Sequence, residues 1–304
     1  MQKRYQLVVL CILLSFGNLI YGQNNVQFSV ILDADTGNEV DDYYALVATL
    51  IEPSWEVLAL NATQWQTSNW SIPQSMENSY RLNQVLLGEL GISVKTRRGG
   101  VARMFDWGDQ AQHSAAAYEI IQQTKALPEE KKLNVIALGA LTNIGSAIFI
   151  DPTIAPRIRL YWLGSTYDFE EGIYKKLDFN CVMDVQALET VLESEVEMHV
   201  IPVNIAAAMT FDFAETKEKL PQDHSLSRLL LDRWFEHLDG GRKSRTIWDL
   251  ALIQAIRHPE WATTQTIMTS KDNGSRIITF YKSIDAEKMK NDFFLQVNSF
   301  LSRQ

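Results

Sequence analysis

Apolar residues along the chain follow two alternating patterns, one of strand length and one of helical spacing. Continuous apolar runs of strand length lie at residues 28–32, 56–62, 133–140, 158–164 and 198–205. Between them, apolar residues recur with the i, i+3, i+4 spacing of amphipathic helices, at 41–51, 76–91, 114–127, 141–150 and 184–194. Strands without polar alternation are buried on both faces, and their alternation with helices implies right-handed crossovers. The pattern predicts a doubly wound α/β, Rossmann-like fold with a mainly parallel central sheet.

Beyond residue 205 the pattern becomes more helical. Helices are expected at 224–238, 247–256 and 286–301. Two short β-rich runs, 264–270 and 275–281, are joined by "KDNG", and an Asn-Gly pair between such runs is typical of a hairpin. We therefore expect a helical C-terminal part with a small β-hairpin.

The first 22 residues have the pattern of a secretory signal peptide. "MQKRY" precedes the apolar run "LVVLCILLSF", which is too short to span a bilayer. We expect cleavage after Gly22, so that the mature chain is a single domain over residues 23–304, without a linker or an internal repeat. The protein is then expected in a periplasm or a secreted space, with no stable membrane insertion after cleavage.

The chain is acidic, with 37 Asp and Glu residues against 28 Lys and Arg residues and a formal net charge of −9. Removal of Lys3 and Arg4 with the signal peptide takes this charge to −11. Such a balance argues against nucleic acid as a partner and is compatible with cation binding. Only Cys181 remains in the mature chain, so no internal disulfide is expected.

A dense group of acids follows the first predicted strand. In "VILDADTGNEVDDYYAL" the residues Asp33, Asp35, Glu39, Asp41 and Asp42 lie within ten positions of one another. A single Asp before a helix is usually an N-cap, but carboxylates that converge at a buried strand end repel one another unless a cation compensates. Oxygen ligands favour a hard cation, Ca²⁺ or Mg²⁺, and ligands of open parallel sheets lie beyond the carboxyl ends of the strands.

Two other acidic motifs fit this segment poorly. An EF-hand loop that begins at Asp33 would have Gly37 one place early and Tyr44 where a bidentate Glu is needed. Phosphatases of the haloacid dehalogenase type also begin with a strand and an Asp-x-Asp pair, but they have Thr or Val where this chain has Gly37. The pair alone leaves that alternative open.

The segment resembles the N-terminal motif of the inosine-uridine preferring nucleoside hydrolases, Asp-Thr-Asp-Pro-Gly-x-Asp-Asp, with two additional residues before the final Asp pair. The likeness continues in the same order along roughly residues 27–300. It covers "LALNATQ", "LGALTNIGSAI" (Gly-Pro-Leu-Thr-Asn in the family), "LDFNCVMDVQAL" (Glu-Phe-Asn) and "TIWDLALIQAI" (His-Asp-Pro-Leu-Ala).

This resemblance implies a Ca²⁺ site and a water-activating acid. The implied Ca²⁺ ligands are Asp35, Asp42, the main-chain carbonyl of Thr142, and Asp249. Asp41 matches the carboxylate that activates water. Asp33 matches the first Asp of the motif, which supports the site more than it binds metal.

The implied substrate contacts are Asn61, Asp178 and Asn180, with Asp178 in place of the family's Glu. Gly172 falls where the family has another sugar-binding Asn, so one hydroxyl contact is lost or supplied elsewhere. Trp248 replaces the His that is the family's proposed general acid. An indole N–H cannot protonate a leaving group, so Trp248 would instead stack on a base or close the pocket.

Three further residues are candidates for the lining of the pocket. His113 is the one mature histidine in a region that can fold over the site, although a lone His is more often a packing or surface residue. Trp65 and Trp70 follow Asn61 and would either line a base site or pack under a loop.

The resemblance implies a Ca²⁺-dependent hydrolase that cleaves the N-glycosidic bond of a ribonucleoside or a related ribosyl compound. Members of the family are often dimers or tetramers, so the resemblance also implies a homo-oligomer. The replacements at Trp248 and Gly172 motivate a second hypothesis, a secreted sugar- or nucleoside-binding protein without turnover. The third is the Mg²⁺-dependent phosphatase. Released reducing sugar, binding alone, or released phosphate would distinguish the three.

Overall fold

The core of the molecule is an eight-stranded sheet with helices on both faces, seen in a computed structural model that describes residues 28–67, 71–236, 241–271 and 274–304. The predicted signal peptide at 1–22 lies outside these residues. The strands, in spatial order, are β11 (Ala262–Met268), β12 (Ile277–Ile284), β8 (Glu197–Ile201), β5 (Ile158–Leu163), β4 (Leu133–Ala137), β1 (Phe28–Ala34), β2 (Trp55–Ala62) and β3 (Thr96–Arg98). Every neighbouring pair is parallel except β11 and β12. The predicted doubly wound α/β class is confirmed.

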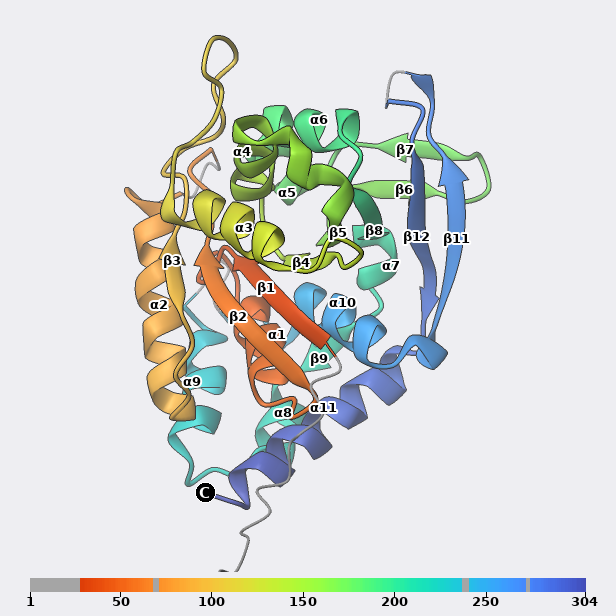
Figure 1. Cartoon of the computed structure of the whole chain (residues 1–304). Coiled ribbons are helices and arrows are strands. Elements are labelled where there is room, and N and C mark those ends of the chain that lie inside the picture. The colour runs from red at the N-terminus through yellow and green to blue at the C-terminus, as the bar shows by residue number, and fades with distance from the viewer. Residues whose placement is uncertain (1–27, 68–70, 237–240, 272–273) are drawn as a thin grey trace, which may run out of the picture.

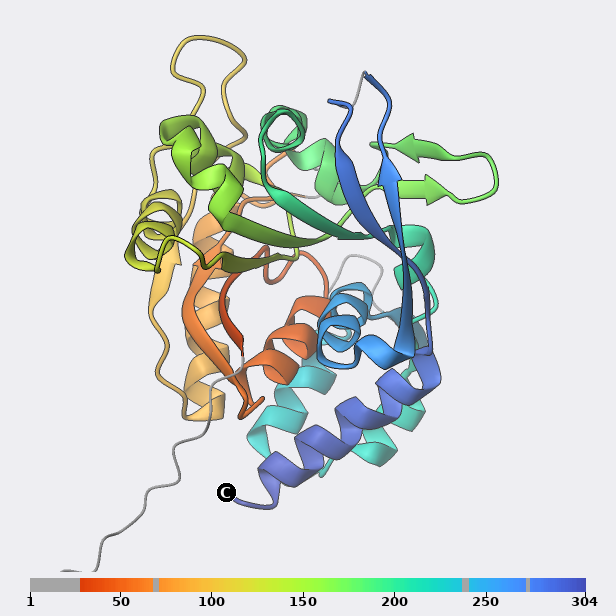
Figure 2. The same cartoon turned by 45° about the vertical axis from the view of Figure 1, so that its right-hand side comes forward.

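Helices cover the sheet in two groups, on opposite faces (Figures 1 and 2). One group is α1 (Asp41–Leu50), α2 (Ser75–Leu90), α8 (Phe213–Lys219), α9 (Ser225–Arg233), α10 (Trp248–Arg257) and α11 (Ala286–Leu301), whose apolar side chains belong to one core cluster or pack against it. The other group is α3 (Ala115–Ala126), α4 (Thr142–Ile150) and α6 (Val185–Glu193), which form the second cluster. Short elements complete the chain: α5 (Phe179–Met183), α7 (Val203–Ala206), the 3₁₀ turns Pro152–Arg157 and Pro259–Trp261, and the strand pairs β6 (Thr166–Asp168) with β7 (Ile173–Lys175) and β9 (Thr210–Asp212) with β10 (Ser244–Thr246).

Strand β1 shows why an unbroken apolar run was needed at the centre of the sheet. Its alternate residues serve both cores, because Val30 and Leu32 pack in one cluster and Ile31 in the other. Burial of such side chains contributes about 1.5–3 kcal/mol each. The order of the strands reverses at β1, since the chain runs through β2 and β3 on one side and through β4, β5 and β8 on the other. Ligand sites of open α/β sheets lie at this switch point.

The observed elements differ from the predicted ones mainly in length. The run 198–205 was predicted as one strand, but β8 ends at Ile201 and α7 begins at Val203. Pro202 explains the break, because proline has no N–H to continue a ladder. The predicted helix 224–238 ends at Arg233 in α9. Among the described residues, no helix is long and apolar enough to cross a membrane.

Candidate active site

The end of β1 and the start of α1 form the base of the site. Asp33 lies near the end of the strand, and a turn begins at Asp35, whose carbonyl accepts from the N–H of Asn38 (3.1 Å). Gly37 has a φ of +95°, and a Cβ there would lie 2.3 Å from Leu82 Cδ1. Only glycine accepts both constraints, so the turn returns the chain directly into the helix that begins at Asp41.

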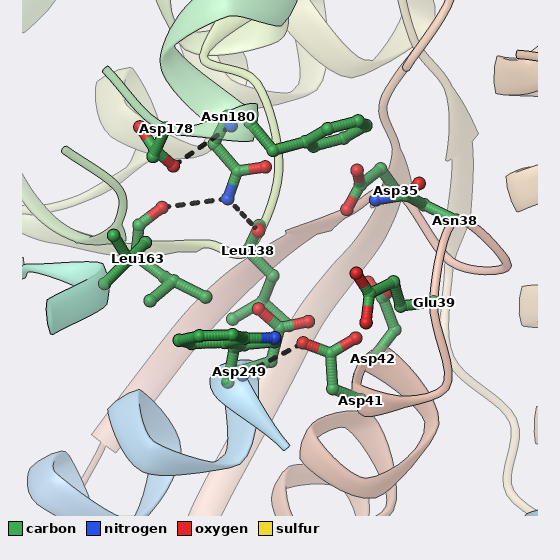
Figure 3. Close-up of a pocket in the computed structure, with 13 residues that line it drawn as sticks. Asp35, Asn38, Glu39, Asp41, Asp42, Leu138, Leu163, Asp178, Asn180 and Asp249 are labelled. Atoms are coloured by element: carbon green, nitrogen blue, oxygen red, sulfur yellow. Dashed lines mark hydrogen bonds between the residues drawn. The ribbon is translucent and has the colours of Figure 1, made fainter. Parts of the chain in front are cut away.

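Carboxyl groups from two distant segments converge beyond this turn (Figure 3). Asp41 and Asp42 begin α1, Asp249 begins α10, and all three offer oxygens within 4.8 Å of one another. Asp35 lines the same cavity. Each of the four is at least nine-tenths buried, so their mutual repulsion is weakly screened.

Burial and mutual repulsion disfavour the charged forms of these acids. Burial, followed by the charge of Asp41, raises the pKa values of Asp35 and Asp249 well above the ordinary range. Burial, followed by the charge of Asp35, does the same to the pKa of Asp42. The charged carboxylates therefore destabilise one another in the absence of a cation, and a cation bound between them would stabilise their charged forms.

The donor atoms fit a hard divalent cation. Asp35 Oδ2 and Asp42 Oδ1 are buried and have no hydrogen-bond partner among the described residues. Buried carboxylate oxygens without partners are costly, and several of them at one point are the ligand set that Ca²⁺ and Mg²⁺ prefer. The residues present therefore fit the metal that the resemblance implies.

Asp41 differs from its neighbours in its hydrogen bonds. Its Oδ2 accepts from the main-chain N–H of Asp249 (3.4 Å), which ties the start of α1 to the start of α10. Burial raises the pKa of Asp41 to about 6, against the opposing effects of backbone N–H donors and of the nearby Arg245. A carboxyl group whose pKa lies close to neutrality is suited to accept a proton.

Asp178 and Asn180 form the opposite wall, at the start of α5 (Figure 3). Asp178 caps the helix by accepting from the N–H groups of Asn180 (3.0 Å) and Cys181 (3.1 Å), and it also accepts from that of Ser165 (2.7 Å). The Asn180 Nδ2 donates to the carbonyls of Leu138 (2.7 Å) and Leu163 (2.9 Å), at the ends of β4 and β5. With both amide hydrogens used, Oδ1 is left as the acceptor that points into the cavity.

Together these walls enclose a cavity of about 240 Å³. Its lining consists of Asp35, Asn38, Glu39, Asp41, Asp42, Leu138, Leu163, Asp178, Phe179, Asn180, Val203, Trp248 and Asp249. Seven of the residues singled out from the sequence are thus brought together: Asp35, Asp41, Asp42, Asp178, Asn180, Trp248 and Asp249. The lining combines carboxylic acids with apolar side chains.

Three predicted residues lie behind this lining. Asp33 is fully buried, and burial raises its pKa to about 7 although Asn143 donates to its Oδ2 (2.9 Å). Asn61 lies directly beside it on β2, and its amide has no partner in hydrogen-bond geometry among the described residues. The hydroxyl of Thr142 donates to Asp184 (2.7 Å), so the side chain is engaged away from the cavity, and metal binding by its carbonyl stays a prediction.

Other predicted residues lie outside the cavity. The ring of His113 is exposed and bonded to Asp109 (2.8 Å) and Tyr118 (2.7 Å). Gly172 has a φ of +69° in the exposed turn between β6 and β7 and does not belong to the lining of the cavity. Trp65 is buried against the cavity wall in a small cluster with Met183 and Phe179, and Trp70 lies outside the described residues.

Several lining residues were not assigned a role from the sequence. Glu39 was part of the acidic stretch, but the two-residue insertion left it without a counterpart in the family motif. The structure places it in the lining, where its charge acts on Asp35 and Asp42. Phe179 was visible between Asp178 and Asn180 in the "DFN" motif. Leu163 is the last residue of β5, and Leu138 and Val203 come shortly after β4 and β8. Such apolar positions carry no distinctive signal in the sequence.

The doubly wound sheet and the buried acidic cavity at its switch point define an α/β protein with acids that could hold a metal ion. The sequence profile of the inosine-uridine preferring nucleoside hydrolases matches residues 30–291. The chain belongs to this family, and is accordingly a glycosidase that acts on N-glycosyl compounds. Because the chain belongs to the nucleoside hydrolase family, this activity takes the place of the phosphatase hypothesis.

Individual relatives are distant. A probable uridine nucleosidase from Oryza sativa subsp. japonica is 22% identical, over 77% of this chain and 78% of the relative. A purine-preferring ribonucleoside hydrolase from Gardnerella vaginalis has a TM-score of 0.68 at 17% identity, with 90% of this chain and 98% of that chain covered. An inosine-uridine preferring nucleoside hydrolase from Bacillus anthracis has a TM-score of 0.62 at 16% identity, with 91% and 99% covered. At such identities the two structures support the fold.

Proposed function

We propose that the protein is a Ca²⁺-dependent hydrolase that cleaves the N-glycosidic bond of a ribonucleoside or a related ribosyl compound. The observation that carries the proposal is the cavity in which Asp35, Asp41, Asp42 and Asp249 converge, with buried oxygens of Asp35 and Asp42 left without partners. Family membership supplies the bond that is cleaved.

Asp35, Asp42 and Asp249 would hold the metal, with the Thr142 carbonyl as a further ligand. A bound divalent cation supplies Lewis acidity that favours deprotonation of water and orients the sugar hydroxyls. The oxygens of Asp178 and the Oδ1 of Asn180 provide acceptors for hydroxyl groups on the opposite wall. The sugar would therefore be held between the metal site and these acceptors, which fixes its anomeric carbon relative to Asp41.

Asp41 acts as the general base in this arrangement. Its carboxylate receives the proton of the attacking water while the bond between the anomeric carbon and the nitrogen breaks. Positive charge develops on the sugar ring in such a transition state, and the neighbouring carboxylates stabilise it.

The test is release of reducing sugar from a panel of purine and pyrimidine ribosides, with Ca²⁺ or with a chelator. Asp41→Asn should lower kcat by about 10²–10⁴-fold, because general base catalysis is typically of that size. Glu129→Gln, at an exposed position, is the matched control and should be unaffected. Activity that survives chelation, or full activity in Asp41→Asn, would contradict the mechanism, and ribose binding without turnover would favour the binding-protein hypothesis.

We also propose that the protein is exported to a periplasm or secreted space, on the strength of the signal pattern at residues 1–22. When the full chain is expressed in a bacterial host, the extracytoplasmic protein should begin at Gln23. Intact-mass measurement of that fraction decides this, and retention of residues 1–22 in a cytoplasmic product would refute it.

A further inference from the structure

The described lining of the proposed active-site cavity contains many acids and no basic side chain. Six lining residues are carboxylic acids: Asp35, Glu39, Asp41, Asp42, Asp178 and Asp249. Within the described part of the chain, no Lys, Arg or His belongs to the lining. Arg245 acts on Asp41 from behind the wall, where its Nε donates to the carbonyl of Trp234 (2.9 Å). One divalent cation offsets two formal charges, so the cavity stays attractive to a second positive charge.

The apolar side chains of the lining make the cavity suited to a flat ring. Leu138, Leu163, Phe179, Val203 and Trp248 line it. Trp248 is adjacent in the chain to Asp249, so the indole borders the acidic cluster. The face of an indole attracts cations more strongly than other aromatic faces do, and it stacks on planar rings. A planar ring with a positive charge would be stabilised both by contact with the apolar side chains and by attraction to the carboxylates.

Among the residues that the structure describes, the lining offers no group placed to protonate a leaving nitrogen. Both amide hydrogens of Asn180 are donated to main-chain carbonyls, and Asp178 accepts three main-chain N–H groups. An indole N–H donates hydrogen bonds but does not release its proton near neutral pH, so Trp248 cannot act as a general acid. The remaining carboxyl groups belong to the cluster around the proposed metal and base. A neutral base that needs a proton in order to leave is therefore poorly served.

We propose, on the basis of the proposed hydrolase function, that the preferred substrates are N-ribosides of cationic heterocycles, in which the ring nitrogen is quaternary, as in a pyridinium riboside. The water oxygen forms a bond to the anomeric carbon, and its proton goes to Asp41. The C–N bond breaks with its electron pair passing to the ring nitrogen, which becomes neutral. The leaving group then departs without receiving a proton.

The turnover test compares nicotinamide riboside with inosine and uridine at saturating Ca²⁺, after subtraction of the uncatalysed rates. Because general acid catalysis typically contributes about 10²–10⁴-fold, kcat/KM for nicotinamide riboside should exceed that for the neutral ribosides by at least about 100-fold. A binding test uses dihydronicotinamide riboside, which has a nearly identical shape and no charge. It should bind about tenfold more weakly than the cation.

Variants at Trp248 separate ring recognition from proton delivery. Trp248→Leu should erase most of the binding difference between the charged and the dihydro riboside. Trp248→His adds an acid beside the ring and should raise kcat/KM for inosine more than for nicotinamide riboside. Trp107→Phe, at an 85% exposed position outside the lining, is the control and should change neither.

The outcomes are distinguishable. Hydrolysis of inosine or uridine as efficient as that of nicotinamide riboside, or equal binding of the charged and dihydro forms, would overturn the substrate class and leave the proposed hydrolase in place. Failure to hydrolyse any of the ribosides would overturn both.

Discussion

At the scale of single residues, the site depends on side chains that are anchored by hydrogen bonds to the ends of the strands. Asn180 is the clearest case, because one amide nitrogen bridges the carbonyls of Leu138 and Leu163 at the ends of two strands. The same residue presents its remaining oxygen to the cavity. One side chain thus joins the sheet to the substrate wall.

Asn180→Ala should lower the free energy of unfolding by about 1–3 kcal/mol, because two buried carbonyls lose their donor. Urea denaturation measures this. Asn291→Ala removes one exposed hydrogen bond from Lys219 and should stay within about 0.5 kcal/mol of the parent. Equal decreases in the free energy of unfolding of the two variants would show that the Asn180 bridge contributes no more stability than an exposed hydrogen bond.

At the scale of elements, the turn between β1 and α1 decides the character of the site. Compared with the family motif, the two additional residues lie in this turn, which contains Glu39. The charge of Glu39 raises the pKa values of Asp35, Asp42 and Asp249, after the larger effects of burial and nearer acids. The turn therefore adds a carboxylate to the acidic group of the cavity.

Glu39→Gln should have opposite effects on the metal-free and metal-bound protein. Loss of the repulsion should raise the melting temperature in chelator, while loss of attraction should weaken Ca²⁺ binding by about tenfold, measured by titration calorimetry. Glu129→Gln is again the matched control, since Glu129 is exposed and outside the cavity. A decrease in both melting temperature and affinity would instead indicate a simple packing role.

The elements also show how far the sequence could be read. The main strands β1, β2, β4, β5 and β8 and the helices between them followed from apolar spacing, because burial on two faces leaves a strong pattern. Strands β3, β6, β7, β9 and β10 are three residues each, too short for any periodicity to be distinguished. The end of β8 at Ile201 was missed although Pro202 marks it.

At the scale of the whole molecule, stability is coupled to the ionisation of the buried acids. The unfolded chain releases their protons near the ordinary value of 3.8, whereas burial raises the pKa of Asp33 to about 7 and that of Asp41 to about 6. Between these limits the folded state binds more protons than the unfolded state. The stability of the metal-free protein must then fall as the pH rises through this window.

In chelator, the free energy of unfolding should fall by roughly 5–6 kcal/mol between about pH 4 and pH 7 on account of these groups. Saturating Ca²⁺ should remove most of the decrease, because the cation stabilises the charged forms. Thermal unfolding across this range, with and without Ca²⁺, measures both effects. Asp33→Asn should flatten part of the slope, and a metal-free stability that rises with pH would contradict the role of these groups.

The layered fold, the acidic turn and the family could be predicted from the order of residues alone, because burial periodicity and ordered motifs are local properties of the chain. The sequence also placed Asp41, Asp42, Asp178, Asn180, Trp248 and Asp249 among the candidates. Which of these candidates share a cavity became known from the packing of the folded chain. Asp249 meets Asp41 across 208 positions, whereas His113 and Gly172 remain outside the cavity. That outcome depends on how β1, α1, α5 and α10 pack around the switch point of the sheet, and packing between distant segments leaves no local pattern in the sequence.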